Sequence, residues 1–496
     1  MHRLHNRFTH LTVLAAIVAL LALAVAACAQ QPAAPAAPAQ QPAQAQATAA
    51  PAAKQADAPT AAPKAAQPTT APAAAQPTAA AAAGGAAGAL PKLQGDKFVY
   101  WGGLIFSDKA NKMLEERIKE WGKARNVPVE VVMVNQNETV QKVSAAIQAG
   151  NAPDAFDLGR DFMLQLNAQN QLVPVDDLYK KIGDAHGGWL APVAKATDPK
   201  TFNGKIPGIP FGVGGNVLFR RTDALKAAGF DKAPDTWEEL SKQAAAAQKP
   251  PKTFGMGFAL SNVGDANLTT QMMQSWGGRV ADDTGKKCTI DSPETRAFLK
   301  WITDAYAQNL FPPGVTTWDG AGDNNAYQSG QALFIANTGS VSIWMQQNDK
   351  ELLDATKYSV LPAGPKMRIS TQNPNYRGIW ANSKNKELAK DLMEYLADDK
   401  FMADYFANAI YGPVLKGQQS APIFQTSEVH KGLADLAVNG TAPAYPDVDN
   451  AAFAEYQNNF LTPKMVQKIV VDKKSIDDAI KETQAACQAI YDKYNK

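Results

Sequence analysis

Beyond residue 95 the hydrophobic positions follow two periodicities, one typical of strands and one typical of helices. Apolar runs at Lys97–Trp101, Val129–Val134 and Asp154–Leu158 predict three buried strands. Ser107 and Asn137 can each cap a helix in the two intervening segments, where apolar residues recur at three and four positions. Strands that alternate with helices predict right-handed βαβ units and a mostly parallel sheet.

A second block with the same alternation follows a segment rich in Pro and Gly. Lys205–Arg221 interrupts the periodicity and then resumes an apolar run, as expected where a chain crosses between lobes. Thr222, Thr236 and Ser292 then stand at helix starts, and Thr236 begins a capping box. The part after residue 95 is too long for one ordinary core, so the sequence predicts two α/β lobes.

Polar and glycine residues follow the predicted strands of the first block. In parallel sheets, ligands bind beyond the carboxyl ends of the strands. Those ends fall at Trp101–Gly103, Asn135–Asn137 and Arg160–Asp161, so we expect these residues to border a binding cleft.

Residues 1–27 have the composition of an export signal. Arg3 and Arg7 give a basic start, an uncharged apolar run follows, and small residues precede Cys28. The stretch Val25–Cys28 resembles a bacterial lipobox, which implies that Cys28 is lipid-modified and anchors the mature chain to the membrane. A plain secretory signal and an uncleaved anchor helix are the alternatives, and all three place the rest of the chain outside the cytoplasm.

The composition of residues 28–94 predicts a disordered tether between that anchor and the lobes. From Ala29 to Leu90 the chain is almost wholly Ala, Pro, Gln and Thr, and no residue in it is aromatic. Such a composition buries too little apolar surface to offset the entropy lost on ordering. The pattern does not distinguish a selected spacer from low-complexity drift.

Charge and residue usage exclude several classes of function. The net charge of +2 falls to zero once Arg3 and Arg7 are removed, which gives no support to a nucleic-acid partner. Only His186 and His430 remain outside the signal, and zinc, Ser-His hydrolase and nucleotide-binding motifs are missing from the sequence. We therefore expect neither a metal site nor a cofactor.

Two cysteines remain, Cys288 and Cys487. In an oxidising compartment such a pair is typical of one disulfide, which would join the last helix to the middle of the chain. Two buried free thiols are the alternative, because the distance between the residues does not follow from the sequence.

Six short motifs occur in the order found in the extracellular solute-binding proteins of ATP-driven (ABC-type) sugar importers, a family of maltose-binding-protein type. The motifs are Gly150–Asp154, Gln171–Leu178, Ile209–Gly212, Thr236–Leu240, Ser329–Phe334 and Asn385–Lys390. The resemblance implies a two-lobed periplasmic-binding-protein fold of type II, a ligand cleft between the lobes and closure about a hinge. It also implies a carbohydrate ligand, a membrane permease as partner, a monomer and no catalytic activity.

The same resemblance suggests how the chain is shared between the lobes. The first lobe is expected to hold residues 95–212 and about 337–382, and the second to hold 213–336 and about 383–496.

Cleft residues follow from the resemblance and from the chemistry of sugars. Asp161 matches a carboxylate that accepts hydrogen bonds from sugar hydroxyls in the family, and Arg160 adjoins it. Asp265 and Asn267 fall near contact positions of the second lobe, whereas Leu158, Gly214 and Ser340 depart from the maltose-binding pattern. Since sugars bind aromatic plates and planar polar groups, the remaining candidates are Trp101, Trp276, Trp318, Tyr411, Asn337, Thr338 and Arg377.

Three other functions stay open. Asp161 and Asp265 would also suit a polyamine, an iron ion or another cation. They could instead flank a glycosidic bond in a carbohydrate-active enzyme. The tether alone would suit a structural surface lipoprotein.

Overall fold

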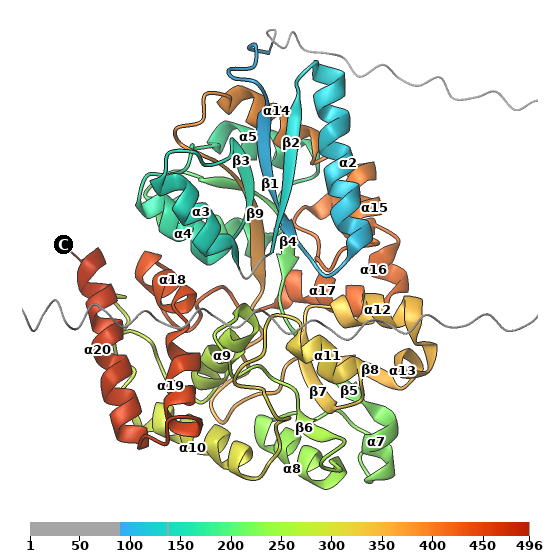
Figure 1. Ribbon diagram of the computed structural model, residues 1–496, viewed down its shortest axis with the longest axis vertical. Helices are drawn as coiled ribbons and strands as arrows, with labels where there is room; N and C mark the ends of the chain where they lie inside the picture. The colour runs from blue at the N-terminus through green and yellow to red at the C-terminus, as the bar shows by residue number, and fades with distance from the viewer. Residues whose placement is uncertain (1–89, 136–137, 496) are drawn as a thin grey trace, which may run out of the picture. The chain divides into compact units, whose positions relative to one another are not determined.

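The computed structural model describes residues 90–135 and 138–495, which lie in one compact unit of the chain (Figure 1). The predicted signal, Cys28 and most of the tether lie outside the described residues, as does the expected helix cap Asn137.

The unit contains two sheets, each with helices packed around it (Figure 1). The first sheet has the order β2 (Val129–Asn135), β1 (Phe98–Leu104), β3 (Ala155–Gly159), β9 (Asn373–Ile379) and β4 (Gly208–Gly214). The second has the order β6 (Phe254–Met256), β7 (Ala332–Asn337), β5 (Val217–Arg221) and β8 (Thr356–Ser359). We call the parts built on these sheets the first and second lobes.

Strand direction differs from the expected mostly parallel pattern. β1 pairs in parallel with β2 and β3, and β6 pairs in parallel with β7. β9 runs antiparallel to β3 and β4, and β5 runs antiparallel to β7 and β8. The reason is connectivity: β4 leaves the first lobe at the point where β9 enters it, so the two neighbours must point in opposite directions. The α/β class is confirmed, with mixed sheets.

Helices of the first lobe surround its sheet. They are α2 (Asp108–Arg125), α3 (Thr139–Gln148), α4 (Arg160–Ala168), α5 (Asp176–Ala185), α6 (Ala191–Ala196), α14 (Lys386–Tyr395), α15 (Asp399–Phe406) and α16 (Ile423–Thr426), with the 3-10 turns η2 (Pro199–Phe202) and η4 (Lys416–Ser420). The predicted cap Ser107 accepts a hydrogen bond from Ala110 N at 3.3 Å. The apolar face of α2 then buries Leu114, Ile118 and Trp121 in the core.

Helices of the second lobe are α7 (Thr222–Ala227), α8 (Trp237–Ala247), α9 (Leu268–Ser275), α10 (Pro293–Ala307), α11 (Gly322–Gln328), α12 (Ser340–Asn348), α13 (Lys350–Asp354), α19 (Leu461–Val470) and α20 (Ile476–Tyr494), with the 3-10 turn η3 (Gly264–Asn267). Thr236 and Ser292 cap α8 and α10 as expected, whereas Thr222 is the first residue of α7 and bonds Ala355 O instead. Cys288 and Cys487 form a disulfide that ties α20 to the chain before α10.

Two helices lie where the lobes meet. α18 (Ala451–Asn458) packs against α4, and its Phe453 and Tyr456 enter the core of the second lobe. α17 (Glu428–Asn439) places Ala437 in the core of the first lobe and Val429 among residues of the second sheet.

The chain is shared between the lobes differently from the expected division. β8 and α12, expected in the first lobe with 337–382, belong to the second, because β8 pairs with β5. α14 and α15, expected in the second lobe with 383–496, bury Leu388 and Phe406 in the core of the first. The chain therefore returns to the first lobe at β9 and stays there through α15.

Three segments connect the lobes, and the second and third of them are joined by hydrogen bonds. They are residues 215–216 between β4 and β5, residues 360–372 between β8 and β9, and residues 440–450 between α17 and α18. Gln372 N donates to Thr441 O at 3.0 Å, and Thr441 N donates to Ser370 O at 2.9 Å. We call these segments the hinge.

Candidate functional site

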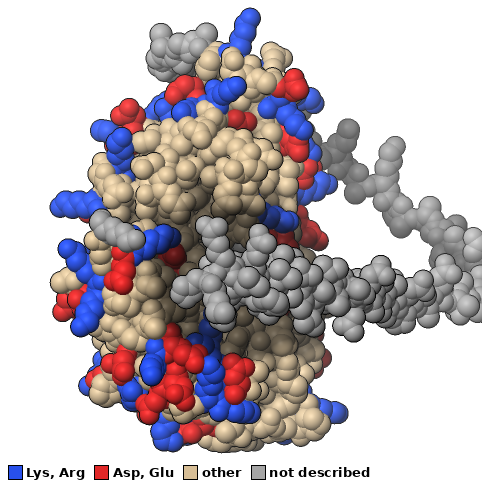
Figure 2. Space-filling model, turned by 60° about the vertical axis from the view of Figure 1, so that its left-hand side comes forward, with Lys and Arg blue, Asp and Glu red and all other residues tan. Residues whose placement is uncertain are grey.

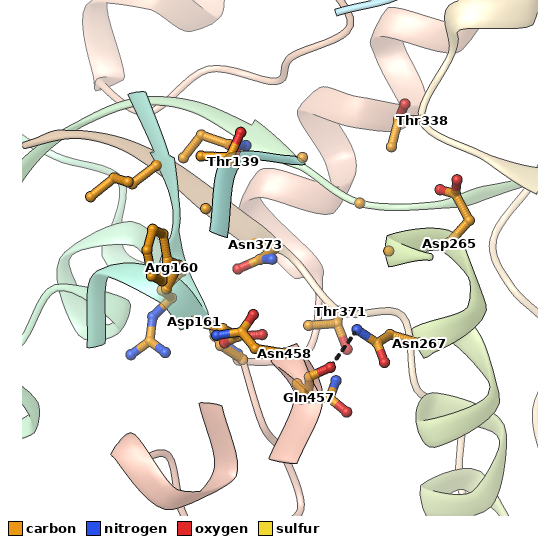
Figure 3. Close-up of a pocket in the computed structure, with 18 of the residues that line it drawn as sticks. Thr139, Arg160, Asp161, Asp265, Asn267, Thr338, Thr371, Asn373, Gln457 and Asn458 are labelled. Atoms are coloured by element: carbon orange, nitrogen blue, oxygen red, sulfur yellow. Dashed lines mark hydrogen bonds between the residues drawn. The ribbon is translucent and has the colours of Figure 1, made fainter. Parts of the chain in front are cut away.

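A cavity of about 600 Å³ opens between the lobes (Figure 3). Its walls come from the carboxyl ends of β3 and β4, from α4, from the hinge, and from η3, α9 and α18. The sequence rule that placed a cleft at the strand ends therefore holds for β3, where Gly159, Arg160 and Asp161 line the cavity. A space of this size suits a small-molecule ligand.

Asp161 lies in the first turn of α4 with its carboxylate at the cavity wall. It accepts no hydrogen bond from any described residue. Burial raises the pKa of Asp161 to about 6, against the opposing effect of the neighbouring Arg160. The structure thus holds an acceptor in the cavity that no group of the described chain satisfies.

Arg160 also borders the cavity, but its guanidinium points away from the other labelled side chains (Figure 3). Nη1 and Nη2 each lie 2.6 Å from an oxygen of Asp449, and Nε and Nη2 donate to Ala196 O. Because Asp449 and Ala196 accept the hydrogen bonds of its guanidinium, Arg160 binds other parts of the protein and does not offer these donors to a ligand in the cavity.

Asp265 stands on the opposite wall, in η3 of the second lobe. Its nearest carboxylate partner is Asp323 of α11, which is 4% exposed and accepts a hydrogen bond from Asn337 Nδ2 at 2.8 Å. Burial raises the pKa of both carboxyl groups, and the nearby Asp265 carboxylate raises that of Asp323 further. Asp323 therefore holds its proton more firmly than Asp265.

Amide side chains supply further acceptors. Asn267, Gln271, Asn373 and Gln457 line the cavity, and each has a buried side-chain oxygen without a hydrogen-bond partner. Asn267 Nδ2 donates to Gln457 O at 3.2 Å, which fixes the orientation of that amide (Figure 3). Since buried polar atoms are normally paired, four such oxygens around one cavity indicate a ligand that donates hydrogen bonds.

Aromatic rings in the cavity wall come from Tyr and Phe rather than Trp. Tyr411 lines the cavity as predicted, with its ring 5.4 Å from that of Phe211 in an edge-to-face contact. The other aromatic lining residues are Phe162, Phe453 and Phe460.

The three tryptophans expected as stacking plates lie elsewhere. Trp276 is 5% exposed and packs 4.8 Å from the ring of Trp301 in the core of the second lobe. Trp101 and Trp318 are half-buried, pack against hydrophobic clusters and are not among the lining residues. Trp276 fills a core and the other two rings cover the edges of clusters, so none of the three lines the cavity as expected.

Two polar candidates are also buried away from the cavity. Arg377 is 1% exposed, lies 3.7 Å from Asp157 through Nε, and stacks its guanidinium over the Phe211 ring. Asn337 is held by Asp323, Asn324 and the backbone of Gly339. Of the other polar candidates, Thr338 does line the cavity.

Sequence reasoning missed Thr371, Asn373, Gln271, Gln457 and Asn458 in the lining. For Thr371 and Asn373 the sequence did offer a signal, because both lie where the chain leaves the hinge and enters β9. The residues of α9 and α18 were not recognisable, because their helices give no pattern that marks the side facing the other lobe.

The described lining offers acceptors and rings but no Lys or His. Within residues 90–135 and 138–495 no group of three or more His, Cys, Asp or Glu could hold a metal ion. The lining thus offers carboxylate, amide and aromatic groups for contact with a ligand.

Comparison with known proteins identifies the family. A profile of the bacterial extracellular solute-binding proteins matches residues 116–431, well over half of the chain. The chain belongs to this family. Its members bind solutes outside the cytoplasm, which confirms the expectation of a non-enzymatic, extracytoplasmic protein and sets aside the carbohydrate-active enzyme.

Individual relatives are distant. A probable ABC transporter-binding protein of Deinococcus radiodurans is 27% identical over 242 residues, 47% of this chain and 56% of that protein. The sn-glycerol-3-phosphate-binding periplasmic protein UgpB of Shigella dysenteriae is 26% identical over 323 residues, 59% of this chain and 69% of that protein. The match thus spans little more than half of the Deinococcus relative.

A solved structure of maltose-bound T. maritima MalE3 has the same fold, with a TM-score of 0.68 and 22% identity. The match covers 79% of this chain and 99% of that one. The two-lobed periplasmic-binding-protein fold is therefore confirmed. In the described part of the chain no helix is both long and apolar enough to cross a membrane.

Proposed function

We propose that this solute-binding protein captures a carbohydrate in the cavity between its lobes and delivers it to the permease of an ATP-driven importer. The observation that carries the proposal is the cavity itself, which joins carboxylate and amide acceptors of both lobes with the rings of Tyr411 and Phe211. Sugar hydroxyls donate to such acceptors, and the C–H faces of sugars pack on aromatic rings.

Relatives support a polyhydroxy ligand. One solved structure of the same fold is described as maltose-bound, and one relative is named for sn-glycerol 3-phosphate. Leu158 and Gly214 line the cavity at positions where the maltose-binding pattern has other residues, which favours a sugar other than maltose.

The hinge supplies the link between binding and transport. A sugar that contacts Asp161 of the first lobe and Asn267 of the second favours a closed form through its differential affinity for that form. The permease would then select the closed, loaded monomer.

The lipid anchor belongs to the same proposal. Modification of Cys28 would hold the receptor at the outer face of the cell membrane, and residues 28–94 would let it reach the permease. Metabolic labelling with a palmitate analogue is expected to mark the protein, and Cys28→Ala to abolish the label.

A thermal-shift screen tests the ligand class. Mono- and oligosaccharides are compared with polyamines and metal ions, since a ligand at about a hundred times its Kd stabilises the protein by about 2.7 kcal/mol. A sugar is expected to raise the Tm. Asp161→Ala should weaken its binding by about 1–3 kcal/mol because a buried acceptor is lost, while the exposed control Asp184→Ala should bind normally.

Other outcomes point elsewhere. A polyamine or metal hit without any sugar hit would replace the carbohydrate function within the same fold. A blank panel would favour a structural surface lipoprotein.

A further inference from the structure

We infer that the cavity is built for a carbohydrate that carries a protonated amine, an amino sugar or an oligosaccharide containing one. The inference rests on the proposed function and narrows its ligand. Its basis is the balance of charges and of hydrogen-bonding groups around the cavity.

The charges that face the cavity sum to a negative value. Asp157 is paired with the buried Arg377 and also accepts hydrogen bonds from Tyr100 and Gly103 N. Arg160 is paired with Asp449 at 2.6 Å. These pairs leave Asp161 and Asp265 as unpaired carboxylates, and the described lining contains no Lys or His to balance them.

The two carboxylates come from different lobes. Asp161 belongs to α4 of the first lobe and Asp265 to η3 of the second, on opposite sides of Asn373 in the view of Figure 3. The groups that act on Asp161 are Arg160 and Asp449, and the group that acts on Asp265 is Asp323. Closure of the lobes around a neutral sugar would bury both charges without a counter-ion, which is costly.

Hydrogen-bonding groups show the same bias. Four residues of the lining, Asn267, Gln271, Asn373 and Gln457, each hold a buried amide oxygen without a partner, and Gln457 is only 9% exposed. A hydroxyl both donates and accepts, whereas an ammonium group brings three donors and no acceptor. An amine on the sugar would thus donate to as many as three of these acceptors and would offset part of the negative charge of the two carboxylates.

The bias also predicts a dependence on pH. The carboxylates of Asp161 and Asp265 must be ionised to hold an ammonium group, and burial raises the pKa of each. Preference for the amine should therefore be greatest near neutrality. It should fade as the pH falls through about 6, where the carboxylates take up protons, and again at higher pH, where the amine loses its own proton. A bound ammonium group lowers both pKa values, so binding near that pH should release protons.

Titration calorimetry on matched sugars tests the inference. Glucosamine, galactosamine, mannosamine and the dimer of glucosamine are each compared with the parent sugar, or cellobiose for the dimer, and with the N-acetyl derivative. The N-acetyl derivative keeps the bulk and removes the charge. Spermidine and sn-glycerol 3-phosphate complete the panel as a cation without a sugar and as an anion.

At about pH 7, where both the carboxylates and the amine are mostly charged, at least one amino sugar is expected to bind about tenfold more tightly than its neutral counterparts. At about pH 5 the ratio should approach one. Asp161→Asn and Asp265→Asn keep the side-chain shape and should each lower the ratio near neutrality, while the exposed control Asp184→Asn should leave it unchanged.

Equal binding of the neutral sugars, or a ratio that neither Asn substitution changes, would overturn the inference and leave the carbohydrate function standing. Tight binding of sn-glycerol 3-phosphate would overturn it too, because two unpaired carboxylates repel a phosphate. Spermidine binding with every sugar silent would overturn both the inference and the carbohydrate function.

Discussion

Arg160 and Asp449 form a partly buried, two-pronged ion pair across 289 residues of sequence, with both N–O distances at 2.6 Å. Arg160 begins α4, and Asp449 lies just before α18, whose Phe453 enters the core of the second lobe. The pair therefore fixes the element that lies between the lobes and shapes one wall of the cavity.

Loss of one partner of this pair should be costly. Arg160→Met leaves Asp449 without its counter-ion and is expected to lower the free energy of unfolding by about 3 kcal/mol. The double variant Arg160→Met with Asp449→Asn should lose clearly less than the sum of the two single variants, because both changes break one interaction. Urea denaturation of the four proteins measures the coupling, and strictly additive losses would contradict it.

The ionised carboxylate of Asp161 should lower the free energy of unfolding while it serves ligand binding. Burial raises the pKa of Asp161 to about 6 in the folded protein, above its ordinary value of 3.8. Between these values the folded state binds more protons than the unfolded state, so stability falls as the pH rises toward 6 and stays lower above it. Without ligand, Asp161→Asn should thus stabilise the protein by on the order of 1 kcal/mol near pH 7.5.

A second urea denaturation at low pH is the control for this prediction. Near pH 4 the native carboxyl group is mostly protonated, so the variant and the parent should unfold at nearly the same urea concentration. A variant that is less stable than the parent at both pH values would show that the ionised carboxylate supports the fold.

Local features of the fold followed from the sequence, and distant partners did not. Ser107, Thr236 and Ser292 cap their helices as expected, because a cap depends on residues three positions away. The partners of Arg160 and Arg377 lie 289 and 220 residues away along the chain, which no local pattern encodes. Both arginines were expected in the cleft: Arg160 borders the cavity with its guanidinium held by Asp449, whereas Arg377 lies in the interior beside Asp157.

Aromatic residues show why the site was only partly predictable. Trp276 and Tyr411 both precede glycine-containing turns in the sequence, yet one fills a core and the other lines the cavity. Which of them faces the cavity depends on how the hinge returns the chain to the first lobe. The expected division of the chain between the lobes was wrong in that region, so the sequence could not place these two residues. Asp161 and Asp265 line the cavity at the positions that the resemblance indicated, and their binding role stays a prediction.

The disulfide between Cys288 and Cys487 should stabilise the second lobe. It closes a loop across 199 residues and anchors α20, which packs on α19 and α18. Replacement of both residues by Ser is expected to cost about 2–5 kcal/mol, since the unfolded chain loses a long-range constraint. A reductant should lower the Tm of the parent to that of the variant and leave the Tm of the variant unchanged. If the parent keeps its Tm although thiol labelling shows that the disulfide is reduced, the prediction is contradicted.

Gly215 should be essential to the hinge for reasons of space. Its φ is +151°, and a Cβ built there would lie 2.4 Å from Leu436 Cδ2 and 2.6 Å from Thr371 O. Gly215→Ala would therefore push the first crossing segment away from the second and from α17, and is expected to lower the Tm and weaken sugar binding together. Gly204→Ala is the matched control, because Gly204 also has a positive φ, +85°, but has open space around its Cβ position. That variant bears the backbone strain alone, so it should destabilise less and bind sugar normally; equal losses in the two variants would show that strain, and not the close approach of the crossing segments, makes glycine necessary.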